Sequence, residues 1–122
     1  MSKIKKEFYR FLVAGFSAVG ADFMAYYFLL NFLSIDLAKV LSFIVGTVLA
    51  FLMNKYWTFE KYERSYNEIW KFVLLYTTSL FANVMINRLV IDLTQIVFFA
   101  FLMATGISAF INFIGQKFWV FK

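Results

Sequence analysis

A short phrase that occurs twice constrains this chain more than any other feature. Residues 54–59 read Asn-Lys-Tyr-Trp-Thr-Phe, and residues 116–121 read Gln-Lys-Phe-Trp-Val-Phe. Each copy closes a long apolar run with an amide, a cation and aromatic rings, which is the chemistry that a helix carries where it leaves hydrocarbon for the headgroup region. The repetition therefore predicts two similar halves, and each half is expected to end at a membrane exit.

The composition indicates a membrane protein. Of the 122 residues, 63% are hydrophobic and only 16% are charged, whereas about a quarter of the residues in a soluble domain are charged. The mean hydropathy is +0.77, and a soluble fold of this size could not bury so much apolar surface. The net charge of +5 comes from cations at the chain ends and in one loop, a distribution that indicates membrane topology and not nucleic-acid binding.

The apolar runs predict an all-α, polytopic membrane protein with four transmembrane helices, arranged as two parallel-repeat helical hairpins. Each run is long enough for the roughly 20 helical residues that cross a bilayer. The absence of proline favours uninterrupted helices. We expect the helices at residues 8–31, 37–56 and 70–92, and from a turn at 92–95 to about residue 116.

The cations predict the orientation. Ten of the twelve Lys and Arg residues precede the first span, flank the middle loop or follow the last span, and only Lys39 and Arg88 lie towards the other side. Because positive residues stay on the cytoplasmic side, we expect a multi-pass protein of the cytoplasmic (inner) membrane with both termini cytoplasmic.

The two halves align residue by residue. Glu7 corresponds to Glu68 and Asp22 to Asn83, and after a one-residue slip Trp57 corresponds to Trp119. Residues 1–122 are therefore interpreted as a single domain with repeat halves at about 7–60 and 68–122. Since each half has two spans, both halves enter the membrane from the same side and form a parallel repeat, unlike the inverted repeats of many transporters.

Residues 10–15, 22–23, 38–46, 51–59 and 113–121 form motifs that are similar to those of a known family. On these motifs the sequence resembles the GtrA-like family, small four-span membrane proteins associated with polyprenyl-phosphate-linked sugars. The resemblance covers essentially the whole chain. Where that family usually has Asn followed by Arg, this chain has Lys55 and Lys117, which keep the charge but lose the bidentate fork of arginine.

The resemblance implies a membrane translocase, or flippase, for polyprenyl-phosphate-linked monosaccharides in cell-surface polysaccharide glycosylation. Its expected partners are the polyprenyl-phosphate sugar lipid, membrane lipids, further copies of the chain and membrane glycosyltransferases, with no nucleic acid. Two alternatives stay open: a non-transporting partner subunit of a glycosyltransferase, and a small proton-coupled multidrug exporter.

Polar residues inside the spans supply the candidate substrate-binding residues. A carboxylate at Asp22 is costly in hydrocarbon, so it either responds to protons or substrate, pairs structurally with Arg88 or Lys39, or is a neutral acid. Asn83 and Asn87 share one helix face and serve either as interhelical contacts or as headgroup contacts. The candidates are Arg10, Asp22, Asn54, Lys55, Trp57, Asn83, Asn87, Arg88, Asn112, Gln116 and Lys117.

The closing phrases allow two readings. Lys55 and Lys117, with Arg10 at a similar depth, could attract a lipid phosphate, or they could anchor the helix ends at the interface. Trp57 could stack on a sugar ring or belong to the aromatic belt. Elsewhere, small residues at four-residue spacing, such as Ser42 with Gly46, predict close helix packing.

Residue types that are missing exclude most enzyme classes. The chain has no His and no Cys, and it has neither paired carboxylates at one depth nor a Gly-rich phosphate loop. We therefore expect no catalytic residues, no metal and no cofactor. Because four short helices enclose little space, we expect either an oligomer or an open lateral groove.

Overall fold

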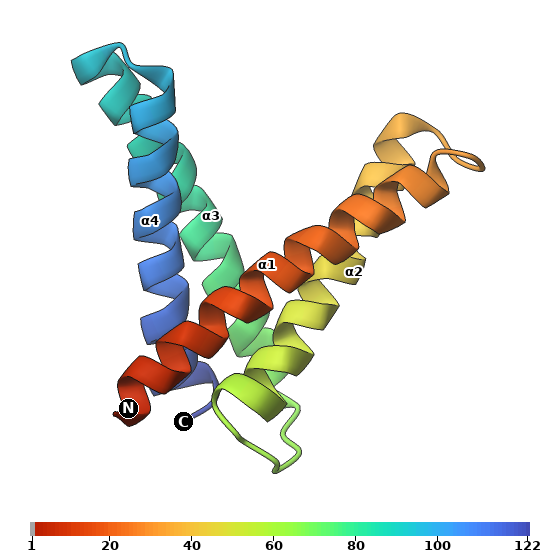
Figure 1. Cartoon of the computed structure of the whole chain (residues 1–122), viewed down its shortest axis with the longest axis vertical. Helices are drawn as coiled ribbons and strands as arrows, with labels where there is room; N and C mark the ends of the chain where they lie inside the picture. Colours follow the sequence, from red (N-terminus) through yellow and green to blue (C-terminus); the bar gives the residue numbers. More distant parts are fainter. Residues whose placement is uncertain (1) are drawn as a thin grey trace. The chain divides into compact units, whose positions relative to one another are not determined.

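The computed structural model describes residues 2–122, and this part of the chain is helical with no strand (Figure 1). Four helices are long and apolar enough to cross a membrane, which confirms the predicted fold class. The chain divides into two compact units, with the boundary between Tyr62 and Glu63. The elements are α1 (Lys3–Leu29), α2 (Ile35–Met53), η1 (Asn54–Thr58), α3 (Asn67–Thr94), α4 (Val97–Gly115) and η2 (Gln116–Val120).

The first unit is a hairpin of α1 and α2, which pack against each other along their length. Serine residues cap both helices: the Ser2 hydroxyl accepts a hydrogen bond from the Lys5 amide, and the Ser34 hydroxyl accepts one from the Leu37 amide. A serine hydroxyl satisfies an amide that has no partner in the first turn of a helix. The caps therefore fix where each helix of the hairpin begins.

Small residues hold α1 and α2 close together. Ala38, Ser42, Gly46 and Ala50 are buried, and their four-residue spacing places them on one face of α2. A Cβ atom on Gly46 would lie 2.8 Å from the carbonyl oxygen of Ala18. The predicted close packing is thus confirmed at Gly46, where only a hydrogen atom fits between the helices.

The second unit is a hairpin of α3 and α4 with a very short turn. Gln95 adopts the left-handed conformation (φ 59°), and its amide donates to the Ile91 carbonyl at 2.7 Å. Ala100 and Ala104 of α4 are buried. At the other end of α4, a Cβ atom on Gly115 would lie 2.7 Å from Cδ2 of Leu75, so α3 and α4 also approach closely there.

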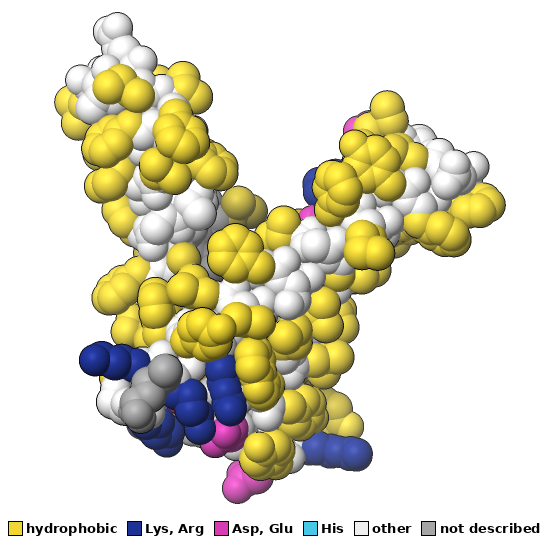
Figure 2. Space-filling view, viewed as in Figure 1, with side chains coloured by type: hydrophobic (Ala, Val, Ile, Leu, Met, Phe, Trp, Pro, Cys, Tyr) yellow, Lys and Arg dark blue, Asp and Glu magenta, His cyan; other side chains and the backbone are white. Residues whose placement is uncertain are grey.

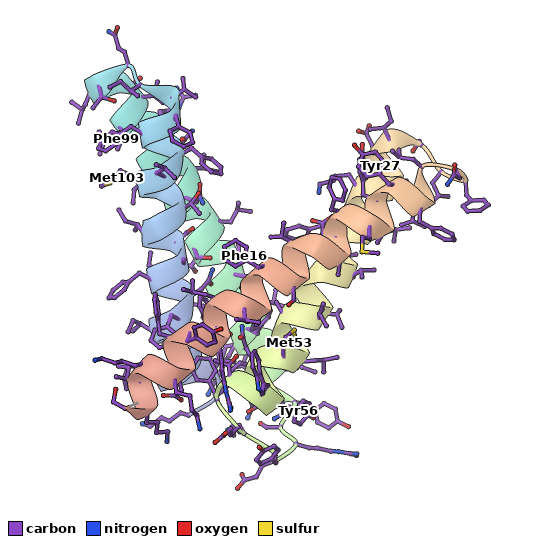
Figure 3. The ribbon with its side chains drawn as sticks, in the orientation of Figure 1. Phe16, Tyr27, Met53, Tyr56, Phe99 and Met103 are labelled. Carbon is purple, nitrogen blue, oxygen red and sulfur yellow. The ribbon has the colours of Figure 1, made fainter. Side chains whose placement is uncertain are left out.

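Large apolar side chains cover the outside of both hairpins (Figure 2). Phe16 and Tyr27 of α1 and Phe99 and Met103 of α4, all labelled in Figure 3, are exposed. In water such a surface would drive aggregation, whereas hydrocarbon solvates it. The exposed apolar surface therefore agrees with a bilayer around each hairpin.

The helix ends differ in two ways from the prediction. α1 and α3 begin earlier than expected, at Lys3 and Asn67, because hydropathy marks the edge of hydrocarbon and a helix can continue past that edge. The two closing phrases each form a π-helical turn, η1 and η2. The spans Ile35–Thr58 and Val97–Val120 are uninterrupted, as expected, but the sequence did not predict that the helix widens at the repeated phrase.

Candidate functional site at the closing motifs

The first closing motif places its polar residues inside the fold. Asn54, Lys55 and Thr58 of η1 are all buried. The Thr58 hydroxyl donates to Oδ1 of Asn54 at 2.9 Å, and the Phe59 amide donates to the Asn54 carbonyl at 2.9 Å. Asn54, the first residue of the π-turn, is therefore hydrogen-bonded to the last residue of the turn and to the residue that follows it. Such turns are rare and occur frequently at functional sites.

Arg10 ties α1 to this motif. One guanidinium nitrogen, Nη1, donates to the Trp57 carbonyl at 2.8 Å and to Oε1 of Glu60 at 3.0 Å. The guanidinium also lies 5.1 Å from the centre of the Trp57 ring, within cation–π distance. Lys6 lies 3.4 Å from the same Glu60 oxygen. We call Lys6, Arg10, Trp57 and Glu60 the Arg10 cluster.

The Arg10 cluster controls the titration of Glu60. The hydrogen bond from Arg10, followed by the charge of Lys6, lowers the pKa of Glu60 below its ordinary value of 4.5. Because the pKa of Glu60 is lower in the folded chain than in the unfolded chain, its ion pairs stabilise the fold at pH values above the unfolded-state pKa. This stabilisation is lost as the pH falls through the folded-state pKa. We expect carbon-detected NMR to show Glu60 titrating below its ordinary pKa in the native chain. In an Arg10→Gln variant the midpoint should rise, and an unchanged midpoint would contradict the contact.

The second closing motif repeats the arrangement with changed residues. Lys71 of α3 lies 5.7 Å from the Trp119 ring centre, as Arg10 of α1 lies over Trp57, and Trp70 meets Trp119 edge-on at 5.8 Å. Gln116 and Val120 are buried, and Lys117 is half-buried. Because valine replaces the threonine of the first motif, η2 lacks the hydroxyl that supports η1.

Two carboxylates are buried that are not among the candidate substrate-binding residues, although they align with each other in the two halves. Glu7 and Glu68 are 4% and 2% exposed, and they occupy corresponding positions near the start of α1 and α3. Buried carboxylates are retained where charges or hydrogen bonds compensate for lost water. The alignment of Glu7 with Glu68 in the two halves was the one signal in the sequence that could have identified them.

Asp22 lies apart from the closing motif and has a partner. Its carboxylate oxygens lie 3.1 and 3.2 Å from Nζ of Lys39, which also lies 5.5 Å from the Tyr26 ring centre. By helical rise, Asp22 is roughly 18 Å along α1 from Arg10. Of the two cationic partners considered for Asp22, the structure shows Lys39.

The second hairpin carries a polar face. The Asn83 amide donates to the Ser108 hydroxyl at 3.0 Å, joining α3 to α4. Ser108 and Asn112 of α4 and Gln116, the first residue of η2, follow at four-residue spacing, so they share one face. The Asn112 side-chain oxygen is buried, and no hydrogen bond reaches it from the described residues. On α3, Asn87 is half-buried and Arg88 is exposed.

The first hairpin lacks this polar face. The positions of α2 that correspond to the polar face of α4 are Gly46, Ala50 and Asn54, so only the last is polar. Asp22 occupies the place of Asn83 and lies beside Gly46, as Asn83 lies beside Ser108. The second hairpin therefore carries Ser108 and Asn112 at two positions where the first hairpin has Gly46 and Ala50.

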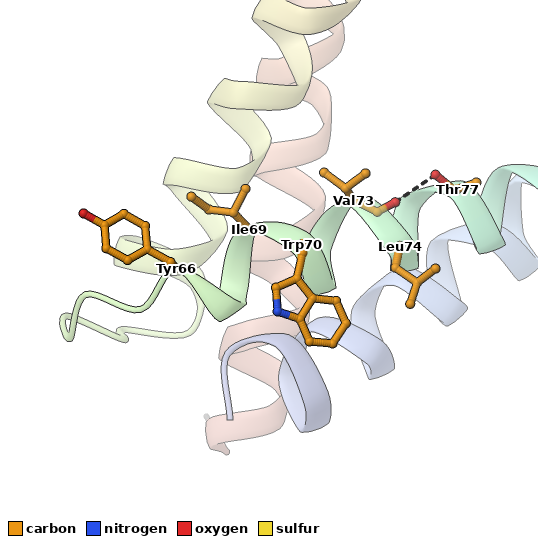
Figure 4. A pocket seen from close by; sticks show the side chains of 6 residues that line it. All are labelled: Tyr66, Ile69, Trp70, Val73, Leu74 and Thr77. Atoms are coloured by element: carbon orange, nitrogen blue, oxygen red, sulfur yellow. Dashed lines mark hydrogen bonds between the residues drawn. The ribbon is translucent and has the colours of Figure 1, made fainter.

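An open apolar groove runs along α3, with a volume of about 560 Å³. The Thr77 hydroxyl on its wall donates to the Val73 carbonyl at 2.9 Å and offers little to a ligand (Figure 4). The groove contains none of the candidate polar residues, so its chemistry suits hydrocarbon and not a charged headgroup. Its walls are Tyr66, Ile69, Trp70, Val73, Leu74 and Thr77.

The fold and the paired closing motifs define a small multi-pass membrane protein built from two helical hairpins. Within residues 2–122, no group of three or more His, Cys, Asp or Glu side chains could hold a metal ion. The family model described as GtrA/DPMS, transmembrane domain, matches residues 10–121. The chain therefore belongs to the GtrA-like family, whose members are membrane proteins of lipid-linked sugar glycosylation. No solved structure matches the chain.

Proposed function

We propose that the protein is a translocase that moves a polyprenyl-phosphate-linked monosaccharide across the cytoplasmic membrane for surface polysaccharide glycosylation. The protein acts without catalytic residues, and both termini lie in the cytoplasm. The isoprenoid tail stays in the lipid, and the polar head moves along the protein. The ligand is thus a single sugar joined to a lipid by one phosphate.

The polar face of the second hairpin carries this proposal. A sugar headgroup that leaves water loses hydrogen bonds, and each unmet polar group is costly in hydrocarbon. Ser108, Asn112 and Gln116 offer polar atoms one helical turn apart, over roughly 12 Å of α4 by helical rise. The buried oxygen of Asn112, which no described donor reaches, is a natural acceptor for a sugar hydroxyl.

Each closing motif, within its own hairpin, offers cations that could contact the phosphate. Arg10 is held beside Trp57, and Lys55 and Lys117 follow the amides that begin η1 and η2. Positive side chains at the end of a span attract anionic headgroups at the membrane surface. Homo-oligomers and membrane glycosyltransferases complete the proposed partners.

Reconstitution tests the proposal directly. The purified chain is placed in liposomes with a fluorescent polyprenyl-phosphate sugar, and lipid that reaches the opposite leaflet is measured with a membrane-impermeant quencher. Flipping by the chain alone supports the translocase. Liposomes that contain the chain but flip no faster than empty liposomes contradict it.

We expect Asn112→Leu to slow flipping about two- to tenfold, because a lost hydrogen bond at a hydroxyl contact is worth about 0.5–1.5 kcal/mol. Phe110→Leu is the matched control, since Phe110 is exposed at a similar depth of α4. Initial flipping rates are compared at equal protein density. Equal rates for Asn112→Leu and the native chain would remove Asn112 from the pathway.

A second candidate function is a non-transporting subunit of a membrane glycosyltransferase. It is favoured by two intramembrane contacts that are complete within their hairpins, Asp22 with Lys39 and Asn83 with Ser108. Polar groups used in this way stabilise helix packing and need no substrate. Flipping that requires an added glycosyltransferase, or glycosyltransferase activity that rises without flipping, distinguishes this function from the first.

A further inference from the structure

Two cations of α1 converge on a single oxygen atom. Nη1 of Arg10 lies 3.0 Å and Nζ of Lys6 lies 3.4 Å from Oε1 of Glu60. Glu60 follows η1 directly and adopts the left-handed backbone conformation (φ 51°). Two positive groups aimed at one acceptor form the kind of site that binds carboxylate and phosphate oxygens.

Arg10 is held in place by more than Glu60. The Trp57 carbonyl accepts from the same guanidinium nitrogen at 2.8 Å, and the Trp57 ring lies against the guanidinium. These two contacts do not depend on the carboxylate. The cation therefore stays positioned when Glu60 moves away, and the site it forms is preorganised for another anion.

The carboxylate is well placed to move. The side chains of Glu60 and Lys6 are 44% and 43% exposed, so the ion pair is accessible and its strength is modest. Glu60 also lies just past Thr58, where the second candidate span ends. A residue just past the end of a span is expected near the edge of the hydrocarbon core, where lipid headgroups begin.

We propose that Lys6 and Arg10 form a binding site for the phosphate of a lipid headgroup, and that Glu60 occupies this site until the phosphate displaces it. The carboxylate is an internal competitor that keeps the cations paired while no ligand is bound. In the second repeat, Asn67 and Lys122 stand at the positions of Lys6 and Glu60. The exchange of the Glu60 carboxylate for a phosphate is therefore expected in the first repeat and not in the second.

Binding of a short isoprenyl phosphate tests the exchange. The full chain is purified in a non-ionic detergent, and its affinity for geranyl phosphate is measured by calorimetry, with geraniol and inorganic phosphate as separate probes. We expect Glu60→Gln to bind geranyl phosphate about two- to fivefold more tightly, the range that corresponds to one exposed ion pair. Lys6→Gln is expected to weaken binding, and geraniol binding should not respond to Glu60→Gln.

Asp92→Asn is the matched control, because it removes one negative charge from an exposed position of α3. An equal gain in affinity for Asp92→Asn, or no gain for Glu60→Gln, would overturn the proposal. A gain for inorganic phosphate as large as that for geranyl phosphate would overturn the assignment to a lipid headgroup.

The inference rests on the proposed function for its choice of ligand, but its test measures binding and not transport. A chain that shows the expected gain yet moves no lipid contradicts the translocase and leaves the exchange standing. A chain that flips lipid but shows no gain contradicts the exchange alone.

Discussion

Replacing Gly46 by alanine is expected to destabilise the first hairpin by about 1–3 kcal/mol, the usual cost of overpacking. The added Cβ atom would lie 2.8 Å from the Ala18 carbonyl oxygen and 3.1 Å from Cβ of Asp22. Because the nearest atom belongs to the backbone of α1, it cannot rotate away, and the two helices must separate. This cost exceeds the roughly 0.5–1 kcal/mol that alanine gains over glycine inside a helix.

Two other glycines provide the controls for Gly46→Ala. A Cβ atom on Gly106 meets nothing within 4 Å, and one on Gly115 meets the end of the flexible Leu75 side chain. We expect Gly106→Ala to be neutral or stabilising and Gly115→Ala to cost less than Gly46→Ala. Unfolding in mixed micelles with increasing dodecyl sulfate measures all three. If Gly46→Ala is as stable as Gly106→Ala, the close packing of α1 and α2 at this point is wrong.

The sequence predicted the number, type and pairing of the helices, because hydrocarbon demands long apolar helices and short turns force neighbours to pair. It did not predict the π-turns at Asn54 and Gln116, since hydropathy and the absence of proline are the same for α- and π-helical turns. The repeated phrase nevertheless marked both places. The repeat alignment shifts by one residue between residue 22 and the closing phrase. Hydropathy does not indicate which structural feature corresponds to this shift.

For the candidate site, the sequence identified residue types better than contacts. It placed Arg10 and Lys55 at a similar depth, but it did not connect Arg10 with Glu60, which is 50 residues away. It left Asp22 with two cationic partners, because depth alone cannot distinguish Lys39 from Arg88. Side-chain direction around each helix decides such pairings, and one sequence without relatives contains little information on it.

The two hairpins use different side chains at corresponding positions to join their helices. Asp22 and Asn83 occupy corresponding positions, yet Asp22 is paired with Lys39 while Asn83 bonds to Ser108. The position of Lys39 is taken by Phe101 in the second repeat. The first repeat thus joins its helices with a charge pair, and the second joins them with neutral polar groups that continue along α4.

Asp22→Asn is expected to destabilise the first hairpin by about 1–3 kcal/mol, because it leaves the Lys39 ammonium without its counter-ion inside the span. The Lys39 side chain is 57% exposed, so part of the cost can be recovered as the chain extends towards the interface. The effect should appear as a lower free energy of unfolding in dodecyl sulfate titrations.

The double variant Asp22→Asn with Lys39→Met separates a structural pair from a proton-responsive acid. If the pair is structural, the methionine removes the uncompensated charge, and the double variant is expected to regain most of the lost stability and to flip lipid at the native rate. Removing one partner of a desolvated pair is costly, whereas removing both is often nearly neutral. If flipping is lost in the double variant while stability returns, then the Asp22 carboxylate takes part in transport, and its pairing with Lys39 is one state of a working group.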